Sequence, residues 1–76
     1  MTTFEKLKKI ISEQLYVDES KITMDSDIVE DFEADSIEMV DIVMDIEDEF
    51  GVEIPDDAME TMHRIGDVVE YIDANK

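Results

Sequence analysis

The chain of 76 residues carries a formal net charge of −17, is 43% hydrophobic and contains no cysteine. This length provides one small core, the lack of cysteine excludes a disulfide framework, and the negative charge makes nucleic acid and anionic membranes poor partners. No basic segment followed by an apolar run begins the chain, and no apolar run approaches the roughly 20 residues of a membrane span. We therefore expect a cytoplasmic protein with a single domain, residues 1–76, and no membrane insertion; an organelle matrix protein after import is the alternative.

The first predicted helix begins near Thr2, where Thr2 and Glu5 fit a capping box. One side of it carries apolar residues at helical spacing and is expected to pack on the core: Phe4, Leu7, Ile10, Ile11 and Leu15. Three charged residues are expected to face away from the core: Lys6, Lys9 and Glu13.

A long connection is expected over residues 16–35, because turn-forming clusters occur at residues 18–20 and 25–27. Loops of about 20 residues are unusual in a small domain, so this one needs internal anchors. Four apolar residues are expected to supply them by packing inward: Ile22, Ile28, Val29 and Phe32.

The second predicted helix runs from about Ser36 to Phe50, with Asp35 as N-cap, Glu38 in the first turn and Gly51 as C-cap. At about 100° per residue, its apolar residues span about 220°, whereas a helix that buries one face needs about 100°. The helix therefore has more apolar surface than core packing requires.

The middle and the edge of this apolar arc are expected to differ in role. The middle should face the core and consists of Met39, Ile42, Val43, Ile46 and Phe50. The edge mixes apolar residues with carboxylates, which is typical of a transient docking surface, and consists of Ile37, Val40 and Met44 beside Asp41 and Asp48. The alternative is a helix that is buried on two sides.

A short helix is expected to start at Pro55 and cover residues 56–60, and a last helix is expected over about residues 65–73. The inner face of the last helix should consist of Ile65, Val68, Val69 and Ile72, with Tyr71 beside them. These elements predict an all-α fold: a small four-helix bundle with three longer helices, one short third helix and a long first loop.

The negative charge is concentrated in the middle of the chain. Residues 25–60 hold sixteen carboxylates and no Lys or Arg, whereas residues 1–24 sum to zero and residues 61–76 sum to −1. Such a field attracts basic protein surfaces and raises their association rates. The alternative, that the acidity serves only solubility, does not explain why every Lys and Arg is missing from that stretch.

The segment from Asp31 to Ile37, followed by the run from Val40 to Met44 and the step from Ile54 to Asp56, resembles an acyl carrier protein. The similarity extends from Phe4 to Ile72. In that family the serine of an Asp-Ser-Leu motif carries a phosphopantetheine arm. The resemblance implies that a dedicated transferase moves phosphopantetheine from coenzyme A onto Ser36, in the motif Asp35, Ser36, Ile37. The thiol of the arm then holds acyl groups as thioesters.

The resemblance also implies two sets of functional residues. Residues that bind basic patches on the transferase and on fatty acid synthesis enzymes would be Glu38, Val40, Asp41, Met44, Glu47, Asp48, Ile54, Asp56 and Glu60. Residues that line an acyl pocket between the helices would be Met39, Val43, Ile46, Met59 and Met62. Ordinary core packing by the methionines is the alternative for the second set. The carrier is expected to be a monomer.

Three positions depart from the usual pattern of the family. Glu33 stands where glycine is common, and a positive φ there would strain the loop. Arg64 stands where a small hydroxyl residue often caps the last helix, and Asp45 stands where a small apolar residue is common. The helical wheel places Asp45 on the solvent side. These departures affect the expected substrate and partners more than the carrier role.

Two other kinds of site do not fit the sequence. An EF-hand loop needs Gly at its sixth position and Glu at its twelfth, and loops started at Asp25, Asp31 or Asp45 have neither. We therefore predict no dedicated metal site, although loose divalent-cation binding to the carboxylates stays open. A Ser-His-Asp hydrolase would need Ser36 and His63 together with a carboxylate, and the chain lacks a G-x-S-x-G motif. We therefore predict that the chain is not an enzyme.

The favoured interpretation is a free-standing carrier of type II fatty acid synthesis that holds growing acyl chains on Ser36. A polyketide or other specialised acyl pathway is second, and a peptidyl or D-alanyl carrier is third. A non-carrier acidic adaptor that docks on basic protein surfaces is the alternative from another functional class. Such an adaptor would need the acidic helix but not Ser36.

The concentration of like charges in residues 25–60 gives a first prediction. Added salt or millimolar divalent cation should raise the melting temperature, because both screen the mutual repulsion of the carboxylates. Thermal unfolding in buffers of increasing ionic strength measures this effect. A melting temperature that is unchanged or lowered by both additions would contradict the prediction.

Overall fold

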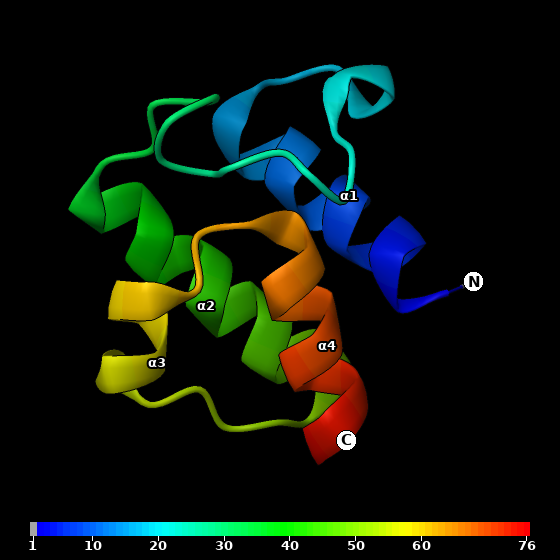
Figure 1. Ribbon diagram of the computed structural model, residues 1–76, viewed down its shortest axis with the longest axis vertical. Helices are drawn as coiled ribbons and strands as arrows, with labels where there is room; N and C mark the ends of the chain where they lie inside the picture. The colour runs from blue at the N-terminus through cyan, green and yellow to red at the C-terminus, as the bar shows by residue number, and fades with distance from the viewer. Residues whose placement is uncertain (1) are drawn as a thin grey trace.

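Residues 2–76 are described by the computed structural model, except for the side chains of Asp56, Met59 and Glu60. Within this range the helices are α1 (Thr3–Leu15), α2 (Ser36–Phe50), α3 (Asp56–Thr61) and α4 (Ile65–Asn75), and a 3₁₀ turn, η1, covers Glu19–Lys21 (Figure 1). Helix α1 packs against both α2 and α4. The predicted all-α fold, with a short third helix and a long first loop, is confirmed.

Helix α1 begins with the predicted capping box. The Thr2 side chain accepts a hydrogen bond from the Glu5 N–H at 3.1 Å, and Glu5 Oε1 accepts one from the Thr2 N–H at 3.1 Å. The hydrogen bond from the Thr2 backbone holds the pKa of Glu5 below its usual value. Leu7 and Ile11 are fully buried on the inner side, as the helical spacing predicts.

The predicted outward orientation of Lys6 is wrong. Its side chain is half-buried, with Nζ 3.9 Å from Glu49 Oε1 and 5.8 Å from the centre of the Phe50 ring. A lysine can pack its aliphatic stem along an apolar surface while its ammonium group stays in water. Lys6 therefore covers the end of α2, and Lys9 and Glu13 remain exposed as predicted.

Asp45 is a second correction. It is half-buried rather than on the solvent side of α2, and its Oδ2 accepts a hydrogen bond from Gln14 Nε2 at 2.6 Å. This bond joins α1 to α2 across their interface. The helical wheel missed it because the wheel treats each helix alone, whereas the position of Gln14 depends on how the two helices pack.

The long connection between α1 and α2 is anchored by buried apolar side chains. Ile22 and Ile28 lie in the core, and Phe32 packs against it, whereas Val29 is half-buried. Figure 1 shows the connection crossing above the helices, from the end of α1 to the start of α2. The predicted anchors Ile22, Ile28 and Phe32 are confirmed, whereas Val29 does not belong to the core cluster or to the side chains packed against it.

The same connection caps α4 with its backbone. Arg64 is the N-cap residue of α4 and supplies no side-chain cap, but the Ile65 and Gly66 N–H groups donate to the carbonyls of Ser26 and Met24, each at 2.8 Å. A Cβ at Gly66 would lie 3.1 Å from the Met24 carbonyl oxygen, which is why glycine suits this position. The loop thus satisfies the first amides of α4, which a capping hydroxyl would otherwise do.

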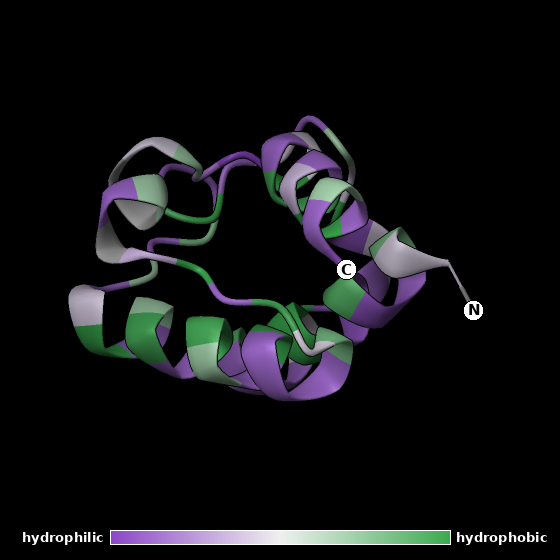
Figure 2. Ribbon diagram, turned by 90° about the horizontal axis from the view of Figure 1, so that it is seen from below, coloured by the Kyte–Doolittle hydropathy of each residue, from purple (hydrophilic) through white to green (hydrophobic). Residues whose placement is uncertain are grey.

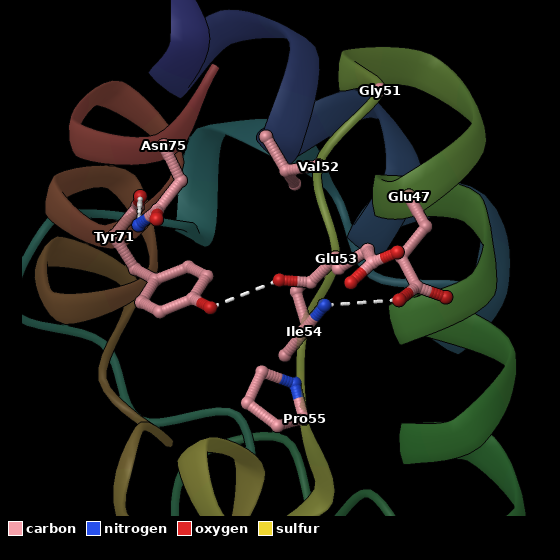
Figure 3. A pocket seen from close by; sticks show the side chains of 8 residues that line it. All are labelled: Glu47, Gly51, Val52, Glu53, Ile54, Pro55, Tyr71 and Asn75. Atoms are coloured by element: carbon pink, nitrogen blue, oxygen red, sulfur yellow. Dashed lines mark hydrogen bonds between the residues drawn. The ribbon is translucent and has the colours of Figure 1, made fainter.

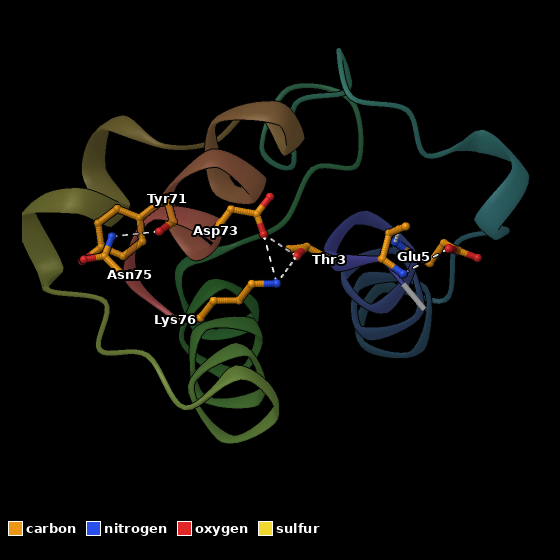
Figure 4. A network of polar contacts seen from close by, with 7 residues as sticks. Thr3, Glu5, Tyr71, Asp73, Asn75 and Lys76 are labelled. Atoms are coloured by element: carbon orange, nitrogen blue, oxygen red, sulfur yellow. Dashed lines mark hydrogen bonds and ion pairs between the residues drawn. The ribbon is translucent and has the colours of Figure 1, made fainter.

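Helix α4 buries the four residues predicted for its inner face: Ile65, Val68, Val69 and Ile72. The helix ends at Asn75, two residues beyond the predicted end, and the Lys76 N–H bonds the Ile72 carbonyl at 3.0 Å. The ends of the chain meet beside it, where the Thr3 hydroxyl donates to Asp73 Oδ1 and accepts from Lys76 Nζ at 3.1 Å (Figure 4).

The contact between the two ends of the chain depends on Asp73, which accepts a hydrogen bond from Thr3 and pairs with Lys76. Hydrogen bonds from the Thr3 hydroxyl and from Lys76, whose Nζ lies 3.3 Å from Asp73 Oδ1, hold the pKa of the Asp73 carboxyl below its usual value. A carboxyl whose pKa is lowered by folding stabilises the fold above its unfolded pKa, and this contribution is lost as the pH falls through its folded pKa.

Thr3→Val should therefore destabilise the protein at pH 7, because the isosteric side chain cannot donate to Asp73 or accept from Lys76. The difference in melting temperature between the variant and the wild type should shrink as the pH falls through the lowered pKa of the folded Asp73 carboxyl. Thermal unfolding at a series of falling pH values, starting from neutral pH, measures both quantities. Thr3→Ser, which keeps the hydroxyl, is the control, and an equal loss in both variants would contradict the role of the hydroxyl.

Candidate functional site

Ser36 is an exposed residue at the start of α2, and Asp35, not Ser36, caps the helix. Asp35 Oδ1 accepts a hydrogen bond from the Glu38 N–H at 2.7 Å, and Glu38 Oε1 accepts one from the Asp35 N–H at 3.1 Å. This reciprocal pair is the capping box predicted from the sequence. With the cap supplied by Asp35, the Ser36 hydroxyl makes no hydrogen bond to any group that the structure describes.

The chain reaches Ser36 through a tight turn. The Glu33 N–H bonds the Val29 carbonyl at 3.0 Å, and the Ala34 N–H bonds the Ile28 carbonyl at 3.3 Å. Ile28 and Ala34 are both buried, so the turn is closed by its backbone and held by the core. Glu33 has φ 55°, which lies in the left-handed region where glycine is favoured over residues with a side chain.

Beyond Ser36, α2 presents an exposed strip that mixes apolar and acidic side chains. Ile37, Val40 and Met44 are 73%, 57% and 56% exposed, and Asp41 and Asp48 are exposed beside them. We call these five residues the docking surface. Figure 2 shows hydrophobic and hydrophilic residues alternating within the turns of α2. The alternative of a helix buried on two sides is excluded by the exposure of the apolar edge.

The structure gives three of the predicted partner-binding residues internal roles. Ile54 is only 6% exposed and belongs to the core, which corrects its expected place on the surface. Glu38 and Glu47 are half-buried and accept backbone hydrogen bonds, Glu38 in the cap of α2 and Glu47 from the Ile54 N–H at 2.9 Å. The side chains of Asp56 and Glu60 lie outside the described part of the chain.

The Glu47 bond belongs to a small hollow between α2, α4 and the segment that joins α2 to α3 (Figure 3). On the opposite side of the segment, the Tyr71 hydroxyl donates to the Glu53 carbonyl at 2.9 Å. The segment is thus tied to α2 through Glu47 and to α4 through Tyr71. The hollow has a volume of about 810 Å³ and is open to solvent. The sequence placed Tyr71 beside the inner face of α4 but gave no signal for this bond, because its acceptor is a backbone atom.

The residues predicted to line an acyl pocket lie in or against one shared core. Ile46 is buried, and Met39, Val43 and Met62 are half-buried and pack against the core cluster. The Met59 side chain is outside the described residues. Met39, Val43, Ile46 and Met62 do not line the hollow beside Tyr71.

Among the side chains that the structure describes, no three His, Asp or Glu residues gather closely enough to hold a metal ion. His63 is half-buried, and its carbonyl accepts the Ile28 N–H at 2.8 Å. The described helices are all too short or too polar to traverse a bilayer.

Known proteins match the chain along its whole length. The family described as "Phosphopantetheine attachment site" matches residues 5–72. The acyl carrier proteins of Helicobacter pylori (strain G27) and Helicobacter acinonychis (strain Sheeba) are 45% and 43% identical over 76 residues, which are 100% of this chain and 97% of each relative. A solved structure of the acyl carrier protein from Enterococcus faecalis is 37% identical, with a TM-score of 0.85 and complete coverage of both chains.

The chain belongs to the acyl carrier protein family. It has a phosphopantetheine attachment site, and as an acyl carrier protein it is a non-catalytic carrier. These findings confirm three predictions from the sequence: the family, the phosphopantetheine prosthetic group and the role of a carrier that is not an enzyme.

The start of α2 fits this prosthetic group. A phosphodiester is favoured at the N-terminus of a helix, because the first backbone N–H groups have no partner within the helix and the helix dipole is positive there. Ser36 is the first residue of α2, and its exposed side chain leaves room for a covalent arm. The carrier has no cysteine, so the working thiol comes from the group.

The internal role of Glu47 gives a prediction for this carrier. Glu47→Ala should lower the free energy of unfolding by about 1 kcal/mol, because the buried Ile54 loses its N–H acceptor. Denaturant unfolding measures the change. Glu47→Gln keeps a carbonyl oxygen at the same distance from the backbone and should lose less. A stability equal to the wild type in Glu47→Ala would show that water replaces the carboxylate without cost.

Proposed function

We propose that Ser36 is the attachment residue and that the carrier holds growing fatty acyl chains on it for type II fatty acid synthesis. The observation that carries the proposal is the exposed Ser36 hydroxyl in the first turn of α2, which bonds no group among the described residues and lies beside an aspartate that already supplies the cap. In the transfer, a P–O bond forms to Ser36 Oγ, the bond to the adenosine bisphosphate half of coenzyme A breaks, and the serine proton goes to a base on the transferase.

The partners are a phosphopantetheinyl transferase and synthesis enzymes that have basic patches near their active sites. The docking surface supports this choice, because its exposed carboxylates alternate with exposed apolar side chains. Each exposed ion pair contributes less than about 1 kcal/mol, so docking is weak and depends on several contacts. Weak binding with fast release suits a carrier that visits several enzymes in turn. From the sequence, we also propose that the carrier is located in the cytoplasm and is a monomer.

The residues proposed to line the acyl pocket favour fatty acyl chains over polyketide intermediates as the cargo. The proposed acyl-lining residues Met39, Val43, Ile46 and Met62 present only apolar and thioether groups, which suits a saturated hydrocarbon chain better than a chain with several carbonyls. An acidic adaptor would use the docking surface alone and would leave Ser36 without a role.

Intact mass, measured before and after incubation with coenzyme A and a broad-specificity phosphopantetheinyl transferase, tests the attachment. The wild type should gain one phosphopantetheine group and Ser36→Ala should gain none. Ser20→Ala, which removes another exposed serine, is the matched control and should be modified like the wild type. A folded wild type that gains no mass would contradict the proposal and favour the adaptor.

A further inference from the structure

Glu33 has a backbone conformation that glycine adopts more easily than any residue with a side chain. Within residues 2–76, only Tyr16 and Glu33 combine a positive φ with a side chain. Tyr16 ends α1 as its C-cap. Glu33 lies in the turn before Ser36. Its N–H bonds the carbonyl four residues earlier, that of Val29, as the Tyr16 N–H bonds that of Ser12. A glutamate there costs conformational free energy that a glycine would not, so the fold itself gives no reason for this residue.

Among the described residues, the Glu33 side chain makes no hydrogen bond that would stabilise the turn. The carboxylates on either side of it do: Asp31 Oδ2 accepts the Asp27 N–H at 2.7 Å, and Asp35 and Glu38 cap α2. Glu33 is exposed, and its carboxylate accepts no hydrogen bond and meets no cation among the described side chains. It is therefore free to bind a group on another molecule.

Glu33 lies within the reach of an interface centred on Ser36. Three residues of extended chain span at most about 11 Å. A protein interface of standard size covers about 800 Å² on each partner, which corresponds to a disc of about 16 Å radius. Along the chain, Glu33 precedes Ser36 whereas the docking surface follows it, so the two lie on opposite sides of the attachment residue in sequence.

We propose that Glu33 is a specificity-determining residue for the loading of Ser36, and that its carboxylate pairs with a lysine or arginine of the phosphopantetheinyl transferase. The chemistry fits, because residues 25–60 contain sixteen carboxylates and no Lys or Arg, so this part of the chain attracts a basic surface. This proposal rests on the proposed function of Ser36. It adds a contact before the attachment residue to the docking surface that follows it.

The test compares four variants in steady-state transfer of phosphopantetheine from coenzyme A by a broad-specificity transferase. Glu33→Gln keeps the shape and removes the charge, and Glu33→Asp keeps the charge. Glu33→Gly removes both the charge and the backbone strain. Glu70→Gln removes one exposed charge from α4 and serves as the matched control for net charge. Melting temperatures are measured for every variant.

Glu33→Gln and Glu33→Gly should each lower kcat/KM by about twofold to fivefold at low salt, through KM rather than kcat. The difference should vanish near about 0.5 M salt, where the Debye length is only a few ångströms. Glu33→Asp and Glu70→Gln should stay near the wild type, and Glu33→Gly should melt at a higher temperature than the wild type.

Equal kcat/KM values for Glu33→Gln and the wild type would overturn the proposal while leaving Ser36 as the attachment residue. A loss in Glu33→Gly without a loss in Glu33→Gln would also overturn it, because the backbone conformation and not the charge would then matter. A wild type that the transferase does not modify would overturn the proposed function, and the role of Glu33 with it.

Discussion

The capping box formed by Asp35 and Glu38 fixes the residue at which α2 begins, and the other features of the site follow from that point. It makes Ser36 the first helical residue, and the Ser36 hydroxyl is not needed for the cap. It also sets the phase of the helix, so that Ile42 and Ile46 face the core while Ile37, Val40 and Met44 face solvent. A helix that began one residue later would turn each side chain by about 100° relative to the cap and would move Ser36 out of the first turn.

The carboxylates of this chain hold backbone N–H groups as well as giving it negative charge. Asp27 accepts from Val29 and Glu30, Asp31 accepts from Asp27, and Glu47 accepts from Ile54. Each bond places a negative charge where backbone N–H groups carry a partial positive charge. These contacts offset part of the repulsion among sixteen carboxylates in a stretch that has no lysine or arginine. Glu33 has no such bond to any group in the described part of the chain.

The long connection between α1 and α2 takes part in the fold rather than merely linking two helices. Ile22 and Ile28 tie it to the core, and its carbonyls at Met24 and Ser26 cap α4. The loop therefore connects the segment that leads into α2 to the start of α4. This explains how Arg64 can stand at the N-cap of α4, because the backbone of another segment satisfies the amides that a hydroxyl would have bonded.

The sequence by itself determined the helices, the capping boxes at Thr2 and Asp35, the exposed apolar edge of α2 and the candidate attachment residue Ser36. These depend on residue type and on spacing within one turn of helix, which can be read along the chain. Only the tertiary structure decided that Asp45 bonds Gln14, that Ile54 is buried, that Lys6 lies along α2 and that loop carbonyls cap α4. These contacts join segments that are distant in the sequence, and many involve backbone atoms, which every residue has and which no sequence pattern can therefore reveal.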